Sequence, residues 1–257
     1  QKFITDAREN PYELNTSTLT PYDIVGTVIK NRNGMSSEER AVLDTTWNAL
    51  ENYVNSDNTL VVVDGSGSMY WGGASVMPAA VAESLGIYFA ERNSGIFRNH
   101  FITFSENPQL VEIKGEDILD KVRYCHDFNE VANTNLEAVF DLILNAAVRN
   151  KVPQEELPAT LYLISDMEFN CCVRNADATN FENAKAKFAA HGYQLPKIVF
   201  WNVQSRSRQQ PVRMNEQGVA LVSGCSPRIF QMLQSGILSP YAQKSRGAVR
   251  TPVAFYL

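Results

Sequence analysis

The feature that most constrains the fold is a continuous apolar run, Thr59-Leu-Val-Val-Val-Asp64. A strand with no polar alternation is typical of the centre of a parallel sheet that is covered on both faces. Further strands are expected at residues 100–104, 109–113, 159–164, 197–203 and 218–222. Helices are expected between them at about 76–92, 116–124, 135–149, 181–191 and 227–235. This alternation predicts an α/β fold, a Rossmann-like three-layer sandwich with a mostly parallel central sheet and helices on both faces.

The chain before this pattern has a different character. Residues 1–19 are polar and aperiodic, and two short helical patterns follow. The first begins at Pro21, and the second opens with Ser36-Ser-Glu-Glu39, an N-cap followed by an acidic first turn. We therefore divide the 257 residues into an N-terminal tail with a helical appendage (1–56), the α/β domain (57–240) and a C-terminal tail (241–257).

Composition excludes several classes of protein. The net charge of −5 disfavours a surface that coats nucleic acid. No uncharged apolar run approaches 18 residues, so no membrane-spanning helix is expected. The chain begins with Gln1, which we interpret as a processed product or a fragment.

The cysteines favour a reducing compartment. The four cysteines form no CxxC pair and have no zinc-ligand spacing to the histidines; they are Cys125, Cys171, Cys172 and Cys225. We interpret them as reduced thiols of an intracellular, cytoplasmic protein. The neighbours Cys125 and His126 fit the end of a helix better than a nucleophile and its base.

Oxygen-bearing side chains gather where the central strands end. Asp64-Gly-Ser66-Gly-Ser68 follows the first strand, Asp166 follows the strand at 159–164, and Thr134 precedes the long helix. Ligands of open α/β sheets collect at the carboxyl ends of the strands, so these loops are expected to meet at one edge. Hydroxyls and carboxylates suit a small hard cation, with Mg²⁺ favoured and Mn²⁺ or Ca²⁺ as alternatives. The other interpretation of the first loop is a tight turn in which Asp64 only caps the next helix.

These residues resemble a known site. Asp64-x-Ser66-x-Ser68, Thr134 and Asp166 are similar to the metal-ion-dependent adhesion site of von Willebrand factor A (vWA) domains. The resemblance implies that both serines bind the metal and that the threonine and the last aspartate bind it directly or through water. It also implies an open coordination position that accepts a carboxylate from a protein partner.

A looser resemblance concerns the sub-family. Three segments are similar to the vWA part of Ro/TROVE-type proteins and to a related uncharacterised bacterial, plant and viral family: Val63-Asp-Gly-Ser-Gly-Ser-Met69, Phe200-Trp-Asn-Val203 and Val222-Ser-Gly-Cys-Ser226. In Ro-type proteins a ring of helical repeats precedes this domain and binds RNA. Residues 1–56 are too short for that ring, so RNA binding does not carry over.

Three functions compete. The leading hypothesis is a binding module, not an enzyme, that captures an Asp or Glu of a protein partner through Mg²⁺. A metal-dependent phosphoryl-transfer enzyme is disfavoured because Ser66 stands where the haloacid-dehalogenase group needs a second acid, and no P-loop lysine follows the glycines. The three histidines are also expected to lie away from the strand ends. The third hypothesis is a component of a Ro-like ribonucleoprotein, although the net charge does not support RNA as a partner.

For other residues near the expected site, both a functional role and a purely structural or solvent-exposed role are open. Glu168 reaches the outer shell of the metal or is a solvated carboxylate, and Tyr70-Trp71 form an aromatic wall for a partner or only cover the sheet edge. Arginines in the loop after residue 203 bind an acidic partner or are solvated surface; they are Arg206, Arg208 and Arg213. Trp201 is expected in the core.

Overall fold

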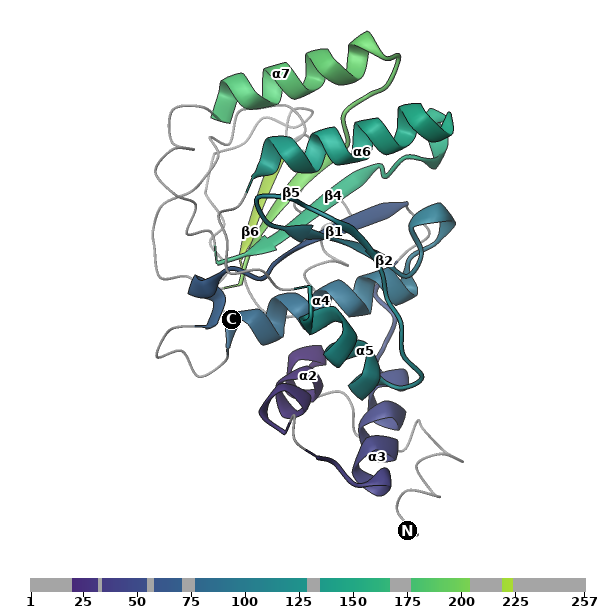
Figure 1. Cartoon of the computed structure of the whole chain (residues 1–257), viewed down its shortest axis with the longest axis vertical. Coiled ribbons are helices and arrows are strands. Elements are labelled where there is room, and N and C mark those ends of the chain that lie inside the picture. Colours follow the sequence, from purple (N-terminus) through teal and green to yellow (C-terminus); the bar gives the residue numbers. More distant parts are fainter. Residues whose placement is uncertain are drawn as a thin grey trace, which may run out of the picture.

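A computed structural model describes residues 20–31, 34–54, 58–70, 77–128, 135–166, 177–203 and 219–223. One six-stranded sheet, in the order β3-β2-β1-β4-β5-β6, lies between two layers of helices (Figure 1). Its strands are β1 (Thr59–Asp64), β2 (His100–Phe104), β3 (Leu110–Glu112), β4 (Thr160–Ser165), β5 (Lys197–Asn202) and β6 (Val219–Ser223). The helices are α2 (Pro21–Lys30), α3 (Ser37–Asn48), α4 (Pro78–Arg92), α5 (Ile118–His126), α6 (Leu136–Asn150) and α7 (Asp177–Ala190). Short 3₁₀ turns are η3 (Gly67–Tyr70), η4 (Gly95–Phe97) and η5 (Gln154–Glu156).

The sheet is parallel apart from one edge pair. β1 pairs with β2 on one side and β4 on the other, both parallel, while β3 runs antiparallel to β2. The register sets Val63 beside Ile164, so the residues that end β1 and β4 reach the same edge of the sheet. The predicted three-layer α/β sandwich with a mostly parallel sheet is confirmed.

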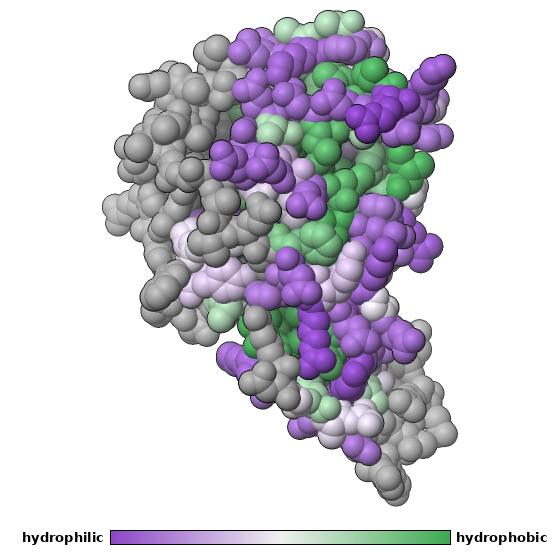
Figure 2. Space-filling model, in the orientation of Figure 1, coloured by the Kyte–Doolittle hydropathy of each residue, from purple (hydrophilic) through white to green (hydrophobic). Residues whose placement is uncertain are grey.

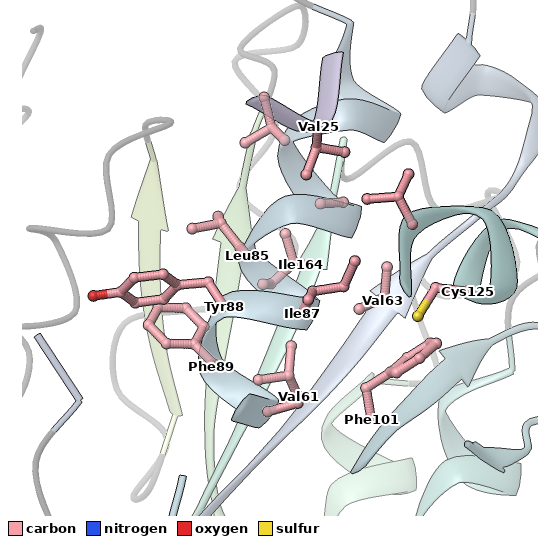
Figure 3. Packing of buried hydrophobic residues seen from close by; sticks show 14 of the residues in the cluster. Val25, Val61, Val63, Leu85, Ile87, Tyr88, Phe89, Phe101, Cys125 and Ile164 are labelled. Carbon is pink, nitrogen blue, oxygen red and sulfur yellow. The ribbon is translucent and has the colours of Figure 1, made fainter. Parts of the chain in front are cut away.

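Alternate residues of β1 enter opposite halves of the core. Val61 and Val63 lie in a cluster with residues of α4 and α5, whereas Leu60 and Val62 lie in a second cluster with residues of α6 and α7. This division follows from the two-residue period of a strand. Figure 3 shows α4 supplying Leu85, Ile87, Tyr88 and Phe89 to the first cluster. Figure 2 shows hydrophilic residues over much of the outward surface of α7, and hydrophobic residues between the two helical layers.

The two N-terminal helices share the first cluster. Val25 and Val28 of α2 and Trp47 of α3 are almost fully buried with the residues of α4 and α5. Arg40 of α3 adds ion pairs to Asp117 (2.7 Å) and Asp120 (2.9 Å) at the start of α5. The helical appendage therefore packs directly on the sandwich, while the domain boundaries at residues 56 and 240 stay a prediction. The expected helix at 227–235 and the tail at 241–257 lie outside the described residues.

Helix starts follow the chemistry of their caps. The side chain of Ser36 accepts the backbone N–H of Glu39, and the Glu39 carboxylate accepts the N–H of Ser36, as predicted for a capping box. Asn135 caps α6 by accepting the N–H of Ala138 at 3.0 Å. Among the described helices, none is both long and apolar enough to cross a membrane.

Candidate metal site

The loop after β1 gathers the first group of site residues. Asp64 ends β1 and is only 3 % exposed, and its Oδ1 accepts the backbone N–H of Ser66 at 2.8 Å. The hydroxyls of Ser66 and Ser68 lie 3.2 Å apart and are half-buried. The structure thus brings together the first three residues of the predicted site. Their close spacing follows from a loop that turns directly into η3 at Gly67.

The end of β4 supplies the second group. Asp166 follows β4 and is 5 % exposed, and Ser165 before it is 1 % exposed. The Ser165 hydroxyl donates a hydrogen bond of 2.5 Å to Oδ2 of Asp64. The backbone N–H of Asp166 donates to the thioether sulfur of Met69 at 3.2 Å. Neither contact was predicted from the sequence, because the β1–β4 register had first to be known.

Electrostatics at Asp64 favour neutralisation. Burial raises the pKa of the Asp64 carboxyl, and the negative charge of Asp166 acts in the same direction. Hydrogen bonds from Ser165 and Ser66 oppose this rise but do not outweigh it. Within the described ranges, Asp64 forms no ion pair with a Lys, Arg or His side chain. Two neighbouring buried carboxylates therefore lie where a cation would relieve an unfavourable charge.

The third predicted loop is described only at its end. Thr134 lies outside the described residues, but Asn135 beside it is the N-cap of α6. The backbone N–H of Asn135 donates to the carbonyl of Ser105 at 3.3 Å, and Ser105 directly follows β2. Since β2 neighbours β1 and runs parallel to it, the end of this loop is fixed at the same edge as Asp64. The approach of Thr134 itself stays a prediction.

One histidine lies closer to the site loop than the sequence indicated. The ring of His126, at the end of α5, meets the ring of Tyr70 edge-on, with centroids 6.0 Å apart. Its Nδ1 lies 3.3 Å from Oε2 of Glu83, a carboxylate 4 % exposed on α4. The expectation that all three histidines lie away from the strand ends needs this correction, because Tyr70 belongs to η3. The packing of α5 against α4, which decides it, has no signal in the local sequence.

The other residues singled out in the sequence either lie in or against the core or fall outside the described residues. Trp201 is fully buried, as predicted, and Tyr70 packs partly buried against the first core cluster. Cys125 is a free, buried thiol one residue before the end of α5, as the interpretation of a helix end required. Outside the described residues lie Trp71, Glu168, Arg206, Arg208, Arg213, Cys171, Cys172 and Cys225.

The described donor set fits Mg²⁺. Carboxylate and hydroxyl oxygens are hard ligands, and Mg²⁺ is usually held by one or two carboxylates with waters in its remaining positions. Asp64, Asp166, Ser66 and Ser68 supply such groups at one sheet edge. Among the described residues, no group of three or more His, Cys, Asp or Glu that could hold a metal occurs.

The strand order, the antiparallel edge strand and the Asp-x-Ser-x-Ser loop after β1 define a vWA-like module. The chain belongs to the family described as "Domain of unknown function (DUF7788)", whose model matches residues 58–247. It is 31 % identical over 239 residues to "Uncharacterized protein L728" of Acanthamoeba polyphaga mimivirus. That match covers 91 % of this chain but only 40 % of the viral protein.

A solved structure supports the same fold. The crystal structure of the Deinococcus radiodurans RO (RSR) protein matches with a TM-score of 0.58 at 13 % identity, over 91 % of this chain and 48 % of that one. This likeness shows the fold. The vWA domain of SpRpn10 matches at a TM-score of 0.40 and 16 % identity, over 76 % of this chain and 100 % of that one. This second likeness is too weak to support an argument about the fold.

Proposed function

We propose that this vWA-type module binds Mg²⁺ at the carboxyl ends of β1 and β4 and uses it to capture an Asp or Glu of a protein partner. Ser66, Ser68 and Thr134 would hold the ion through their hydroxyls, with Asp64 and Asp166 in or next to its coordination shell. When bound, the ion supplies a positive charge with an open position for an external carboxylate. The observation that carries the proposal is the pair of buried carboxylates beside two hydroxyls that lie 3.2 Å apart.

The chain's own residues explain why the site would bind rather than catalyse. Asp64 receives hydrogen bonds on both of its oxygens, from Ser66 and Ser165, which hold it in one orientation. The serine hydroxyls do not titrate near neutral pH and so offer no general base of their own. We therefore propose that the module has no hydrolase activity. Turnover in a screen for Mg²⁺-dependent phosphatase and nucleotidase activity, lost in Asp64→Asn, would overturn this part.

Carboxylate capture can be tested with matched peptides. The immobilised chain is presented with a library of peptides that each carry one Asp or Glu, together with copies in which that residue is Asn or Gln. We expect a subset of the acidic peptides to bind in Mg²⁺ and to be released by EDTA, while the amide copies do not bind. Asp64→Ala should lose this binding. Peptides that bind equally in Mg²⁺ and EDTA would contradict capture through the metal.

A second candidate is a component of a Ro-like ribonucleoprotein, which the fold likeness to the RO (RSR) protein favours. The chain spans about half of that protein's length, and its net charge of −5 is unfavourable for RNA. Fluorescence anisotropy with a labelled single-stranded RNA separates the candidates. RNA binding that falls steeply with salt and survives Asp64→Ala would support the ribonucleoprotein; absence of binding at low salt would leave the protein-binding module.

The compartment forms part of the proposal. Cys125 is a free thiol, and unpaired cysteines are usual in the reducing cytoplasm. We therefore place the module there. Fractionation with an antibody against the native protein tests this, and recovery in a secreted or luminal fraction would contradict it.

A further inference from the structure

Two hydrogen bonds cross between the loops that carry Asp64 and Asp166. In one, the Ser165 hydroxyl at the end of β4 donates to Oδ2 of Asp64 at the end of β1. In the other, the N–H of Asp166 donates to the sulfur of Met69 in η3, at 3.2 Å. Both bonds start at the end of β4. The first reaches the last residue of β1, and the second reaches η3, the turn that follows β1. The two loops are thus joined at two places by protein atoms alone.

We infer that Ser165 and Met69 are positioning residues that hold the two carboxylates of the metal site in place before the ion binds. The inference rests on the proposed function, because it concerns the same site. It adds residues that neither the Asp-x-Ser-x-Ser pattern nor the resemblance to vWA domains assigns. Ser165 fixes the rotation of the Asp64 carboxylate, and Met69 fixes the backbone that carries Asp166.

Geometry gives the Ser165 contact its precision. The parallel register pairs Val63 with Ile164, which sets the next residues, Asp64 and Ser165, side by side at the sheet edge. With the N–H of Ser66 on Oδ1 and the hydroxyl of Ser165 on Oδ2, both carboxylate oxygens of Asp64 accept a hydrogen bond. An ionised carboxylate has about four acceptor positions, so lone pairs remain for the ion or its water.

Met69 is suited to the second contact. Its side chain is fully buried, and the thioether is a weak acceptor that also fills the core beneath the site. Because η3 contains both Ser68 and Met69, anchoring Met69 to Asp166 also fixes the distance between the serine loop and the end of β4. Partners that orient metal ligands in this way affect affinity about 10- to 100-fold when removed.

The test compares Mg²⁺ affinities of the whole chain by isothermal titration calorimetry at fixed pH and salt. Ser165→Ala should weaken Mg²⁺ binding about 10- to 100-fold, and Ser165→Thr, which restores a hydroxyl, should recover most of the loss. Ser84→Ala is the matched control, because Ser84 is equally buried but donates to Val81 within α4. It should leave the affinity unchanged.

Met69→Leu gives an independent test if Ser165→Ala does not fold. Leucine keeps the volume of methionine but removes the sulfur acceptor, so Mg²⁺ affinity should fall while the circular dichroism spectrum stays that of the wild type. Met35→Leu, at a partly buried methionine packed on the same core, is its control.

The outcomes separate the two levels of the proposal. Ser165→Ala and Met69→Leu proteins that bind Mg²⁺ like the wild type, while Asp64→Ala does not, would overturn the positioning role and leave the proposed function intact. A wild-type chain that binds no Mg²⁺ would overturn the proposed function and this inference together. Loss in Ser165→Ala without recovery in Ser165→Thr would also contradict orientation by the hydroxyl.

Discussion

Gly86 of α4 lies so close to Val63 of β1 that a Cβ on the glycine would be 2.5 Å from Val63 Cγ2. Real Cβ atoms are not found at that distance, and the branched side chain of Val63 has little freedom to turn away in the buried strand. The absence of a side chain at Gly86 therefore sets how closely α4 packs on the strand that ends in Asp64.

Gly86→Ala should lower the free energy of unfolding. Alanine gains helix propensity of up to about 1 kcal/mol over glycine, but overpacking costs about 1–3 kcal/mol, and at a 2.5 Å contact we expect the overpacking to prevail. Urea denaturation measures the change. When Gly86→Ala is made in a chain that already carries Val63→Ala, the free energy of unfolding should fall by less than it does in the wild type. An equal fall in both chains would contradict the contact between Gly86 and Val63.

Trp47→Ala should destabilise the whole fold by about 3–5 kcal/mol. Trp47 is fully buried, donates its Nε1–H to Glu91 at 2.7 Å and lies 5.6 Å from the Arg92 guanidinium. These contacts join α3 to α4, so the loss should appear in the single unfolding transition of the sandwich. Ile96→Ala, at a side chain 48 % exposed, is the control. A change as small as that of Ile96→Ala would show that the N-terminal helices contribute little.

Asp64→Asn should be more stable than the wild type without Mg²⁺ and less stable than the wild type with Mg²⁺. Burial raises the pKa of Asp64, so the folded, metal-free chain holds that proton to a higher pH than the unfolded chain. The corresponding stability is complete below the ordinary Asp pKa and is lost as pH rises through the raised value. In EDTA, Asp64→Asn should therefore have the higher Tm at pH 7–8, with the difference shrinking toward about pH 4.

Saturating Mg²⁺ should favour the wild type instead, since the asparagine has no charge to offer the ion. Differential scanning fluorimetry across this pH range, with and without Mg²⁺, measures which of the two proteins has the higher Tm under each condition. The same order of Tm in EDTA and in Mg²⁺ would contradict the role given to Asp64.

Cys125 should resist alkylation in the folded chain. Burial raises the pKa of its thiol well above the usual range, and the negative charges of Glu83 and Glu91 add to this. Figure 3 shows Cys125 in the same core cluster as Phe101. The chain is treated with iodoacetamide at pH 8, with and without urea, and the peptide that contains Cys125 is then analysed by mass spectrometry. Cys125 should be alkylated only in the urea-treated sample. Rapid labelling without denaturant would place the thiol outside the core.

The fold could be predicted because its strands carry strong local patterns. The apolar run at Thr59–Asp64 matches β1 at both ends, and the strand expected at 100–104 coincides with β2. Boundaries shifted where tertiary packing decides them, as in α7, which begins at Asp177 rather than near residue 181. Asp64, Ser66 and Ser68 could be placed together because one short loop carries all three.

Contacts between distant segments could not be predicted in the same way. Ser165 acts on Asp64 only through the β1–β4 register, and His126 meets Tyr70 only because α5 packs beside η3 and α4. The close approach at Gly86 likewise depends on the height of α4 above β1. A single sequence contains no local signal for such relations.

The most direct test of the central claim is calorimetric titration of Mg²⁺ into the wild-type chain and into the Asp64→Ala, Asp166→Ala double variant. The wild type should bind about one ion per chain, as expected for a single site of this kind, and at 100-fold excess over Kd be stabilised by about 2.7 kcal/mol. The double variant should show no binding heat and no rise in Tm, with a folded circular dichroism spectrum. Equal Mg²⁺ binding by both proteins would contradict the assignment of Asp64 and Asp166 to the metal site.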